Sequence, residues 1–141
     1  MNTNQHKFFY KELSYKLQGC FYNIRNEYGP GHKETVYVNL IKEYLGAEGV
    51  LCEKEKAMNI YSSKTGKMVG TYKPDLVVDG KILVEVKSSR FVTKQDEKQL
   101  YHYLRNSEYE VGYLVNFSTR NFYFKRIIYT NDKKPFLKKH K

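Results

Sequence analysis

The stretch Ile82-Leu-Val-Glu-Val-Lys87 decides the fold of this chain. Apolar residues occupy nearly every position except Glu85, a pattern typical of a strand that is covered on both faces and lies centrally in its sheet. Burying an unpaired carboxylate in such a strand costs several kcal/mol, so the side chain must be paired, protonated or bound to a metal ion. Glu85 is therefore the first candidate for a functional residue.

Lys87 follows Glu85 by two residues, which places both side chains on one face of the strand with their Cα atoms ~6.6 Å apart. The carboxylate can hold a divalent metal ion. The lysine can orient an attacking water or stabilise charge that develops on a phosphate. An ordinary salt-bridged strand end gives the same Glu-x-Lys tripeptide, so the pair alone does not separate chemistry from structure.

The turn that precedes this strand decides whether Asp75 can join Glu85. A two-residue turn over 79–80, which is Asp-Gly, would place Asp75 opposite Val84 and on the wrong face. A three-residue loop over 79–81, with the glycine left-handed as part of a bulge, would place Asp75 opposite Glu85. The hypothesis of a shared carboxylate site therefore predicts the three-residue register.

Two carboxylates on one face, together with the backbone carbonyl of Val86, suit Mg²⁺ or Mn²⁺. These hard cations prefer oxygen ligands and keep several waters that a phosphate can displace. The sequence thus predicts Asp75, Glu85 and Val86 as metal ligands.

The remaining pattern predicts an α/β fold in which helices flank a mixed central β-sheet, in the order α-α-β-β-β-α-β-β. We expect one domain over 1–130 and a basic, flexible C-terminal tail over 131–141. The expected helices span 8–27, about 32–45 and 93–106, and the expected strands span 51–61, 68–78, 81–88, 111–117 and 122–129.

Glu34 stands in the first turn of the second expected helix, near its apolar stripe, so it is expected on the buried side as a further acid. The alternative is a carboxylate that simply favours the positive end of the helix dipole. His32 lies in the preceding Gly-Pro-Gly-His loop, where it could contact phosphate or cap the loop.

Gln99 and Tyr103 are one turn apart on the third expected helix and are therefore neighbours. Because this helix directly follows the Glu85 strand, its start can overhang the site. Gln99 could then bind the metal-bound water or a phosphate, and Tyr103 could hold the nucleic-acid backbone. The alternative is a helix surface with Tyr103 packed in the core.

The formal net charge of +10 favours a polyanionic partner, because neutralising phosphates releases counterions, although the charge could also serve solubility alone. The Tyr and Phe residues could stack unpaired bases, but most are expected in the core. Cys20 and Cys52 have no metal-type spacing and are expected to be reduced. The first residues lack a signal-peptide core, and no apolar run approaches the ~20 residues of a membrane helix. We therefore expect a cytoplasmic protein.

These motifs together resemble a known family. Gly31-His-Lys-Glu34-Thr-Val-Tyr37 matches the Gly-x-x-Glu-x-x-Tyr signature of the GxxExxY proteins. The resemblance covers roughly 8–130. It continues through Asp75-Leu-Val-Val, Val84-Glu-Val-Lys87, Gln99-Leu-Tyr-His-Tyr103 and Gly112-Tyr-Leu-Val-Asn-Phe117.

That family is placed in the PD-(D/E)XK nuclease superfamily. The resemblance implies a restriction-endonuclease-like core with Asp75, Glu85 and Lys87 as the nuclease triad and Glu34 as an additional helical acid. Gln99 and Tyr103 resemble the Gln-x-x-x-Tyr motif of RecB-like nucleases. Lys73-Pro-Asp75 keeps the superfamily's Pro-Asp pair.

The sequence therefore predicts a Mg²⁺- or Mn²⁺-dependent nuclease with nucleic acid, expected to be DNA, as substrate. The expected catalytic residues are Glu34, Asp75, Glu85, Lys87 and Gln99, the expected substrate contacts are Tyr103, His32 and Lys73, and the expected metal ligands are Glu34, Asp75, Glu85 and Val86.

Two alternatives stay open at this point. A non-catalytic nucleic-acid-binding or recruitment module explains the charge and aromatics, but not an acidic cluster inside a basic protein. A structural protein could instead pair its carboxylates with Lys87 and Lys73. A homodimer is also possible, with the aromatic strand at 122–124 as an edge that pairs with a second copy.

Overall fold

The computed structural model describes residues 9–138. Its elements follow the order that the sequence predicts, except that two of the expected strands are each divided in two and two short helical segments are added at the end. They are α1 (Lys11–Tyr28), α2 (Glu34–Ala47), β1 (Cys52–Lys54), β2 (Met58–Tyr61), β3 (Met68–Tyr72), β4 (Leu76–Val78), β5 (Ile82–Lys87), α3 (Lys94–Arg105), β6 (Val111–Asn116), β7 (Tyr123–Ile128), the 3-10 turn η2 (Asn131–Lys133) and α4 (Pro135–Lys138).

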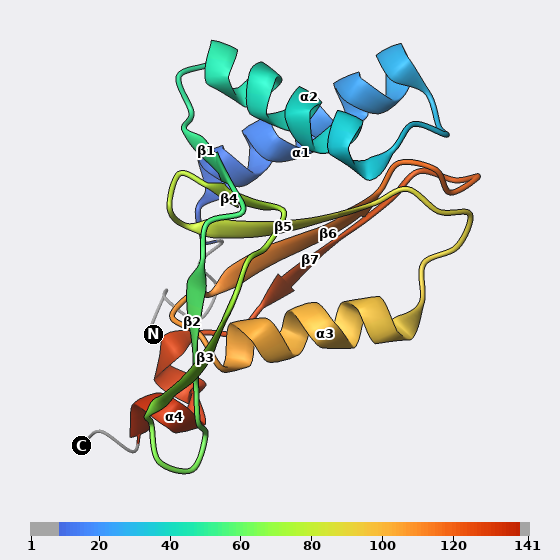
Figure 1. Cartoon of the computed structure of the whole chain (residues 1–141). Coiled ribbons are helices and arrows are strands. Elements are labelled where there is room, and N and C mark those ends of the chain that lie inside the picture. The colour runs from blue at the N-terminus through green and yellow to red at the C-terminus, as the bar shows by residue number, and fades with distance from the viewer. Residues whose placement is uncertain (1–8, 139–141) are drawn as a thin grey trace, which may run out of the picture.

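The main sheet is mixed and has five strands in the order β1-β4-β5-β6-β7. β5 pairs in parallel with β6, while the other neighbouring pairs are antiparallel. The apolar β5 lies in the middle of the sheet, as its sequence predicts. Helices α1 and α2 cover one face and α3 covers the other, which gives three layers (Figure 1).

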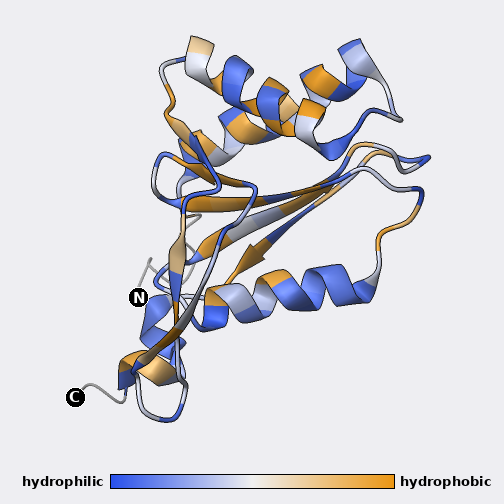
Figure 2. Ribbon diagram, in the orientation of Figure 1, coloured by the Kyte–Doolittle hydropathy of each residue, from blue (hydrophilic) through white to orange (hydrophobic). Residues whose placement is uncertain are grey.

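Both faces of the sheet are packed, but unequally. The larger apolar cluster joins α1 and α2 to alternate residues of β5, such as Val84 and Val86. A smaller cluster joins Leu100 and Leu104 of α3 to Leu83. Apolar residues dominate the central strands, whereas α3 is mainly hydrophilic apart from the residues that meet the sheet (Figure 2). Only Leu100 and Leu104 of α3 are buried, so the rest of this helix does not add to the apolar core.

The expected strands 51–61 and 68–78 are each divided between two sheets, which corrects the sequence interpretation. Glu55 has a φ of 55°, a conformation that L residues rarely adopt, and it separates β1 from β2. Pro74, which cannot donate a ladder hydrogen bond, stands between β3 and β4. The intervening β2 and β3 form a separate antiparallel hairpin that projects beside α3 and α4 (Figure 1).

The flexible tail expected over 131–141 is wrong for residues 131–138, which fold as η2 and α4. Phe136 is 1% exposed and stacks on Tyr61 of β2, with ring centroids 4.7 Å apart. The buried Lys134 ammonium donates a hydrogen bond of 2.7 Å to the carbonyl of Ser107 and another to that of Tyr109. This segment therefore fastens the hairpin to the domain, and only 139–141 of the expected tail lie outside the described residues.

Across residues 9–138, none of the helices has both the length and the apolar character that a membrane span needs.

Candidate active site

The turn between β4 and β5 adopts the register that the site hypothesis requires. Asp79 and Gly80 both have positive φ, 52° and 66°, as a tight hairpin of the type I′ class demands. The Lys81 amide donates to the Val78 carbonyl at 2.9 Å, yet Val78 pairs with Ile82 rather than with Lys81. Lys81 is thus the extra residue of a bulge, and the three-residue register is confirmed.

This register brings Asp75 and Glu85 together. The Asp75 amide donates to Oε1 of Glu85 at 3.3 Å, and the Val86 amide donates to Oδ2 of Asp75 at 2.8 Å. The two carboxylates therefore lie side by side on the face of the sheet that α3 covers, and the backbone fixes one oxygen of each.

The surroundings disfavour a negative charge on these carboxylates. Glu85 is 8% exposed, and burial, reinforced by the charge of Asp75, raises its pKa from 4.5 to about 7. Hydrogen bonds from Tyr72 and from the Asp75 amide, together with the Lys87 charge, act in the opposite direction. Burial is also the largest cause that raises the pKa of Asp75, against the hydrogen bond from Val86.

The donor set of this site fits a hard divalent cation. Two adjacent carboxylates repel each other, and a cation between them stabilises both in the charged form. Mg²⁺ binds through one or two carboxylates and keeps several waters, so Asp75 and Glu85 suffice as its protein side chains. Val86 lies next to Glu85 in the same strand, and its amide donates to Asp75.

Glu34 does not complete a three-carboxylate centre. Within the described part of the chain, no group of three or more His, Cys, Asp or Glu side chains is close enough to hold a metal ion. Glu34 is exposed at the start of α2, on the helix layer opposite α3, so the expectation of a buried-side position is wrong. Its charge nevertheless raises the pKa of Asp75, which places it within electrostatic range of the site.

Lys87 lies on the same face of β5 as Glu85, as alternation along the strand predicts. It is half-buried, and its Nζ lies 3.9 Å from Oδ1 of Asp96 in the first turn of α3. Its charge lowers the pKa of both Glu85 and Asp75. The contact with Asp96 is long, so the ammonium is held loosely and stays available to a substrate phosphate.

Tyr72 is a site residue that the sequence interpretation missed. Its hydroxyl donates to Oε2 of Glu85 at 3.0 Å, and its ring stacks on Tyr103 with a centroid distance of 3.8 Å. Burial and the charge of Glu85 raise the pKa of Tyr72, so the hydroxyl stays protonated and keeps donating. The only signal in the sequence was Pro74, which ends β3 just after Tyr72 and turns this strand away from the main sheet.

Gln99 and Tyr103 of α3 are neighbours, as their spacing predicts. Burial and the charge of Glu85 raise the pKa of Tyr103, while hydrogen bonding with Tyr72 and Gln99 lowers it. Tyr103 thus lies beside the carboxylate site and also packs against the smaller apolar cluster. Gln99 is exposed at the rim of this arrangement.

A hollow of about 650 Å³ lies beside the C-terminal end of β5 and contains His32, Glu34 and Ser88 in its lining. The hydroxyls of Ser88 and Ser118 lie 2.7 Å apart, and the Gly31 amide donates to the Ser118 hydroxyl at 2.9 Å. Ser88 also donates to the His32 carbonyl. These two serines, which the sequence interpretation did not single out, connect the ends of β5 and β6 to the loop before α2.

Tyr37 explains the last position of the Gly-x-x-Glu-x-x-Tyr motif. Its hydroxyl donates to the Gly29 carbonyl at 2.6 Å and accepts from the His32 amide at 3.2 Å. Its ring stacks on Phe117 with centroids 4.3 Å apart. Gly31 has a φ of 98°, which L side chains rarely adopt. The motif therefore shapes the loop that carries His32 and presents Glu34 to the hollow.

Two predicted substrate contacts, His32 and Lys73, lie outside the carboxylate pair itself. The His32 ring makes a 3.0 Å hydrogen bond with the Tyr28 carbonyl, so one of its nitrogens is already engaged within the loop. Lys73 is exposed between β3 and β4, directly before Pro74 and Asp75. Both residues lie on segments that lead into the site, and neither lies against the paired carboxylates in the described contacts.

The sequence matches a known protein superfamily. One solved structure, described as the crystal structure of SSO0001, is 17% identical with a TM-score of 0.44 and covers 96% of this chain and 84% of that one. No curated protein matches the chain. Residues 11–127 match the PD-(D/E)XK nuclease superfamily, whose restriction-endonuclease-like fold is consistent with the mixed five-stranded sheet and its flanking helices. Because this match spans most of the sequence, the chain belongs to the PD-(D/E)XK nuclease superfamily.

Proposed function

We propose that the protein is a divalent-metal-dependent nuclease that hydrolyses phosphodiester bonds in nucleic acid, with DNA as the expected substrate. The observation that carries this proposal is the paired carboxylates of Asp75 and Glu85, next to Lys87 on the same face at the end of β5. Membership of a superfamily whose members are generally nucleases supports it.

Each residue has a definite part in the proposed mechanism. Asp75 and Glu85, with the Val86 carbonyl, would hold Mg²⁺ or Mn²⁺. Such an ion, when bound, activates water and neutralises phosphate charge. Lys87 orients the attacking water and stabilises charge on the pentacovalent, phosphorane-like transition state. Glu34 adds negative charge near Asp75 and so favours the cation without joining the pair.

The remaining expected residues position the substrate. Tyr103 and Gln99 lie along the α3 side of the carboxylates, where they can hold the phosphate backbone. His32, which lines the hollow next to Ser88, and the exposed Lys73, which precedes Asp75 by two residues, would contact phosphate. The net charge of +10 supplies the sequence-independent part of the affinity, which should weaken steeply with salt.

A cleavage assay tests the proposal directly. Labelled single-stranded, duplex and branched DNA, and matched RNA, would be incubated with wild-type protein in Mg²⁺, Mn²⁺ or EDTA. Lys87→Ala is the test variant. Lys81→Ala is its matched control. Lys81 directly precedes β5, at the end of the strand opposite Lys87, and it is exposed and paired with Asp79.

Cleavage that requires metal, persists in Lys81→Ala and is lost in Lys87→Ala would establish the nuclease. Binding without any cleavage, indifferent to metal and unchanged in Lys87→Ala, would refute it.

A non-catalytic nucleic-acid-binding or recruitment module is the second candidate. The net charge of +10 and the many Tyr and Phe residues favour it as much as they favour a nuclease. It leaves the buried pair Asp75 and Glu85 without a purpose, since carboxylates repel phosphate when no cation lies between them. Retention of DNA with no turnover in any metal would favour this module.

Two further features of the proposal concern the protein's setting. Cys20 and Cys52 are free and buried, and burial raises the pKa of their thiols to about 12 and about 11. Inert reduced thiols suit the cytoplasm, which we propose as the location. A homodimer is proposed through β7, which is an edge of the main sheet, and light scattering would test it.

A further inference from the structure

Phe91 is the most exposed large apolar side chain next to the candidate active site. It is 75% exposed and lies in the connection between β5 and α3, four residues after Lys87. At 3.3–3.6 Å per residue, its Cα lies within ~14 Å of that of Lys87. A single exposed aromatic is unremarkable by itself, so its surroundings decide whether it has a purpose.

Hydrogen bonds hold the backbone around Phe91, while its ring is exposed to solvent. The Ser89 hydroxyl donates to the Phe91 carbonyl at 2.9 Å, and the amide of the fully buried Asn116 side chain donates to the same carbonyl at 3.4 Å. The Ser89 amide in turn donates to Oδ1 of Asn116 at 3.2 Å. The end of β6 thus pins the loop and presents the ring to solvent in a defined place.

Two hollows meet at Arg90, directly before Phe91. The first is the hollow of about 650 Å³ that contains Glu34 and Ser88 in its lining. The second, of about 380 Å³, is lined by Phe91 and Lys94 among others, and Arg90 belongs to both. We call this combined surface the Arg90 trough. Its lining includes Ser88 and Ser89, which directly follow Lys87 at the end of β5, and Phe91.

The Arg90 trough is positively charged where it passes Phe91. Lys94 and Arg90 line it, and the Arg90 guanidinium lies 6.0 Å from the centre of the Phe91 ring. Glu97 is the acid in this part, but Lys125 neutralises it at 2.8 Å and holds its pKa below the usual range.

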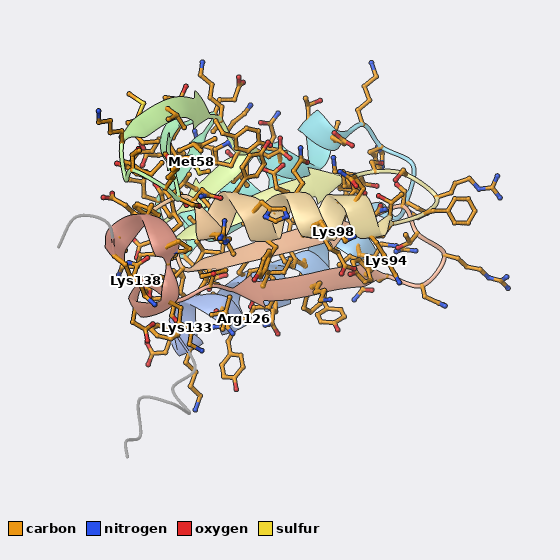
Figure 3. The ribbon with its side chains drawn as sticks, turned by 90° about the horizontal axis from the view of Figure 1, so that it is seen from below. Met58, Lys94, Lys98, Arg126, Lys133 and Lys138 are labelled. Carbon is orange, nitrogen blue, oxygen red and sulfur yellow. The ribbon has the colours of Figure 1, made fainter. Side chains whose placement is uncertain are left out.

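Lys94 and Lys98 lie at the same end of α3, apart from Lys133 and Lys138 at the other end of the molecule (Figure 3). The basic residues near Phe91 are therefore a separate group from those of the C-terminal segment.

We propose that Phe91 stacks on an unpaired base of the strand that the active site holds, while Arg90 and Lys94 contact its phosphates. In a duplex, neighbouring base pairs cover the faces of each base, so a protruding ring selects unpaired or terminal bases. The favoured substrate is therefore single-stranded or locally unpaired nucleic acid. This inference rests on the proposed nuclease function and adds the substrate class to it.

Fluorescence anisotropy in EDTA tests the stacking contact without cleavage. The probes are labelled oligothymidine, the same oligonucleotide with its central bases removed as abasic sites, and a blunt hairpin duplex. Phe91→Ala should weaken binding of oligothymidine by roughly tenfold, within the range for base stacking on an aromatic ring. Binding of the abasic probe should not change, because it keeps the phosphates and lacks the bases.

Three further variants sharpen the test. Phe91→Tyr keeps an aromatic face and should bind oligothymidine as wild type does, whereas Phe91→Leu keeps only the apolar character and should behave like Phe91→Ala. Tyr15→Ala is the matched control, because Tyr15 is 57% exposed but lies on α1. It should leave the binding of every probe unchanged.

The outcomes separate this inference from the function on which it rests. Equal losses of oligothymidine and abasic binding in Phe91→Ala, or no loss at all, would overturn the stacking contact alone. Base-dependent binding through Phe91 in a protein that cleaves nothing would overturn the nuclease and leave the stacking contact standing. A wild-type protein that binds none of the probes in EDTA but cleaves DNA with Mg²⁺ would overturn the stacking contact and leave the nuclease standing.

Discussion

The two faces of β5 differ in what surrounds them, although they alternate along one short strand. Val84 and Val86 point toward α1 and α2 and are fully buried in the larger apolar cluster. Leu83 begins the other face in the same way, but Glu85 and Lys87 continue it with charges under α3. The apolar face thus stabilises the fold. That stability offsets the free-energy cost of burying the Glu85 carboxylate on the other face.

Loss of Lys87 should have the largest effect, and on activity rather than stability. We expect Lys87→Ala to lower the cleavage rate about 100- to 1,000-fold, because removing one preorganised stabilising group costs about 3–4 kcal/mol in the transition state. The free energy of unfolding should change by under about 1 kcal/mol, since the half-exposed Lys87–Asp96 contact is 3.9 Å long. Single-turnover cleavage and urea unfolding measure the two quantities. A variant that unfolds easily and cleaves normally would make the lysine a structural residue.

The next effect concerns pH in the absence of metal. The folded-state pKa of Glu85 is raised from 4.5 to about 7, so its contribution to stability is complete below pH 4.5 and is lost as pH rises through about 7. Relative to Glu85→Gln, the wild-type protein in EDTA should lose up to about 3 kcal/mol across this window. Unfolding experiments at pH 4.5 and 8 would show it.

Metal provides the complement to that experiment. At pH 8 Mg²⁺ should raise the melting temperature of the wild-type protein, because a ligand that binds only the folded state stabilises it by mass action. The rise should disappear in Glu85→Gln. An equal rise in both proteins would place the ion elsewhere.

The apolar face of β5 should show the opposite behaviour from Lys87. Val84→Ala removes fully buried methyl groups and should cost about 2 kcal/mol of stability through lost burial and the cavity left behind. Cleavage per folded molecule should remain close to that of the wild type. Measuring both at low temperature, where the variant stays folded, separates the effects. A rate loss as large as that of Lys87→Ala would show that the two faces are not independent.

The smallest expected effect tests Tyr72 as a positioning residue. Its hydrogen bond lowers the pKa of Glu85, so Tyr72→Phe should raise that pKa further, by about half a unit to one unit for a bond worth about 1 kcal/mol. The acid limb of the pH–rate profile should move upward by the same amount. Tyr44→Phe removes a comparable bond to Glu27, between α1 and α2, and is the matched control. A profile that shifts in neither variant would leave Tyr72 with a packing role only.

Much of the fold was readable from local patterns. The apolar run of β5 predicted a central strand, and the Asp-Gly turn limited the register to two choices, of which the site hypothesis selected the observed one. The helix expected over 93–106 matches α3, which starts with a capping box between Thr93 and Asp96. Each of these features depends on residues that are close together in the sequence, which is why the pattern sufficed.

What the sequence could not provide depends on distant contacts. Tyr72 reaches Glu85 from a separate hairpin, which ends where Pro74 interrupts the expected strand. No periodic pattern in the sequence identifies Glu85 as the partner of Tyr72. Glu34 lies near an apolar stripe yet is exposed, because it is the first residue of α2 and lines the hollow of about 650 Å³. The sequence places Lys134 in a solvated tail. Its burial depends on hydrogen bonds to the carbonyls of Ser107 and Tyr109, which follow α3.

The stack of Phe136 on Tyr61 has a consequence for the order of folding. It closes a loop of about 75 residues, and the entropic cost of such closure delays contacts between distant parts of a chain. The strands that pair with near neighbours in sequence, β4 with β5 above all, need no such closure. We therefore expect β4 and β5 to gain amide protection first in pulsed hydrogen exchange, and residues 131–138, which pack on Tyr61, to gain it later. Simultaneous protection of both would contradict this order. In the expected order, the protein passes through a kinetic phase in which Asp75 and Glu85 are already paired but Phe136 has not yet stacked on Tyr61.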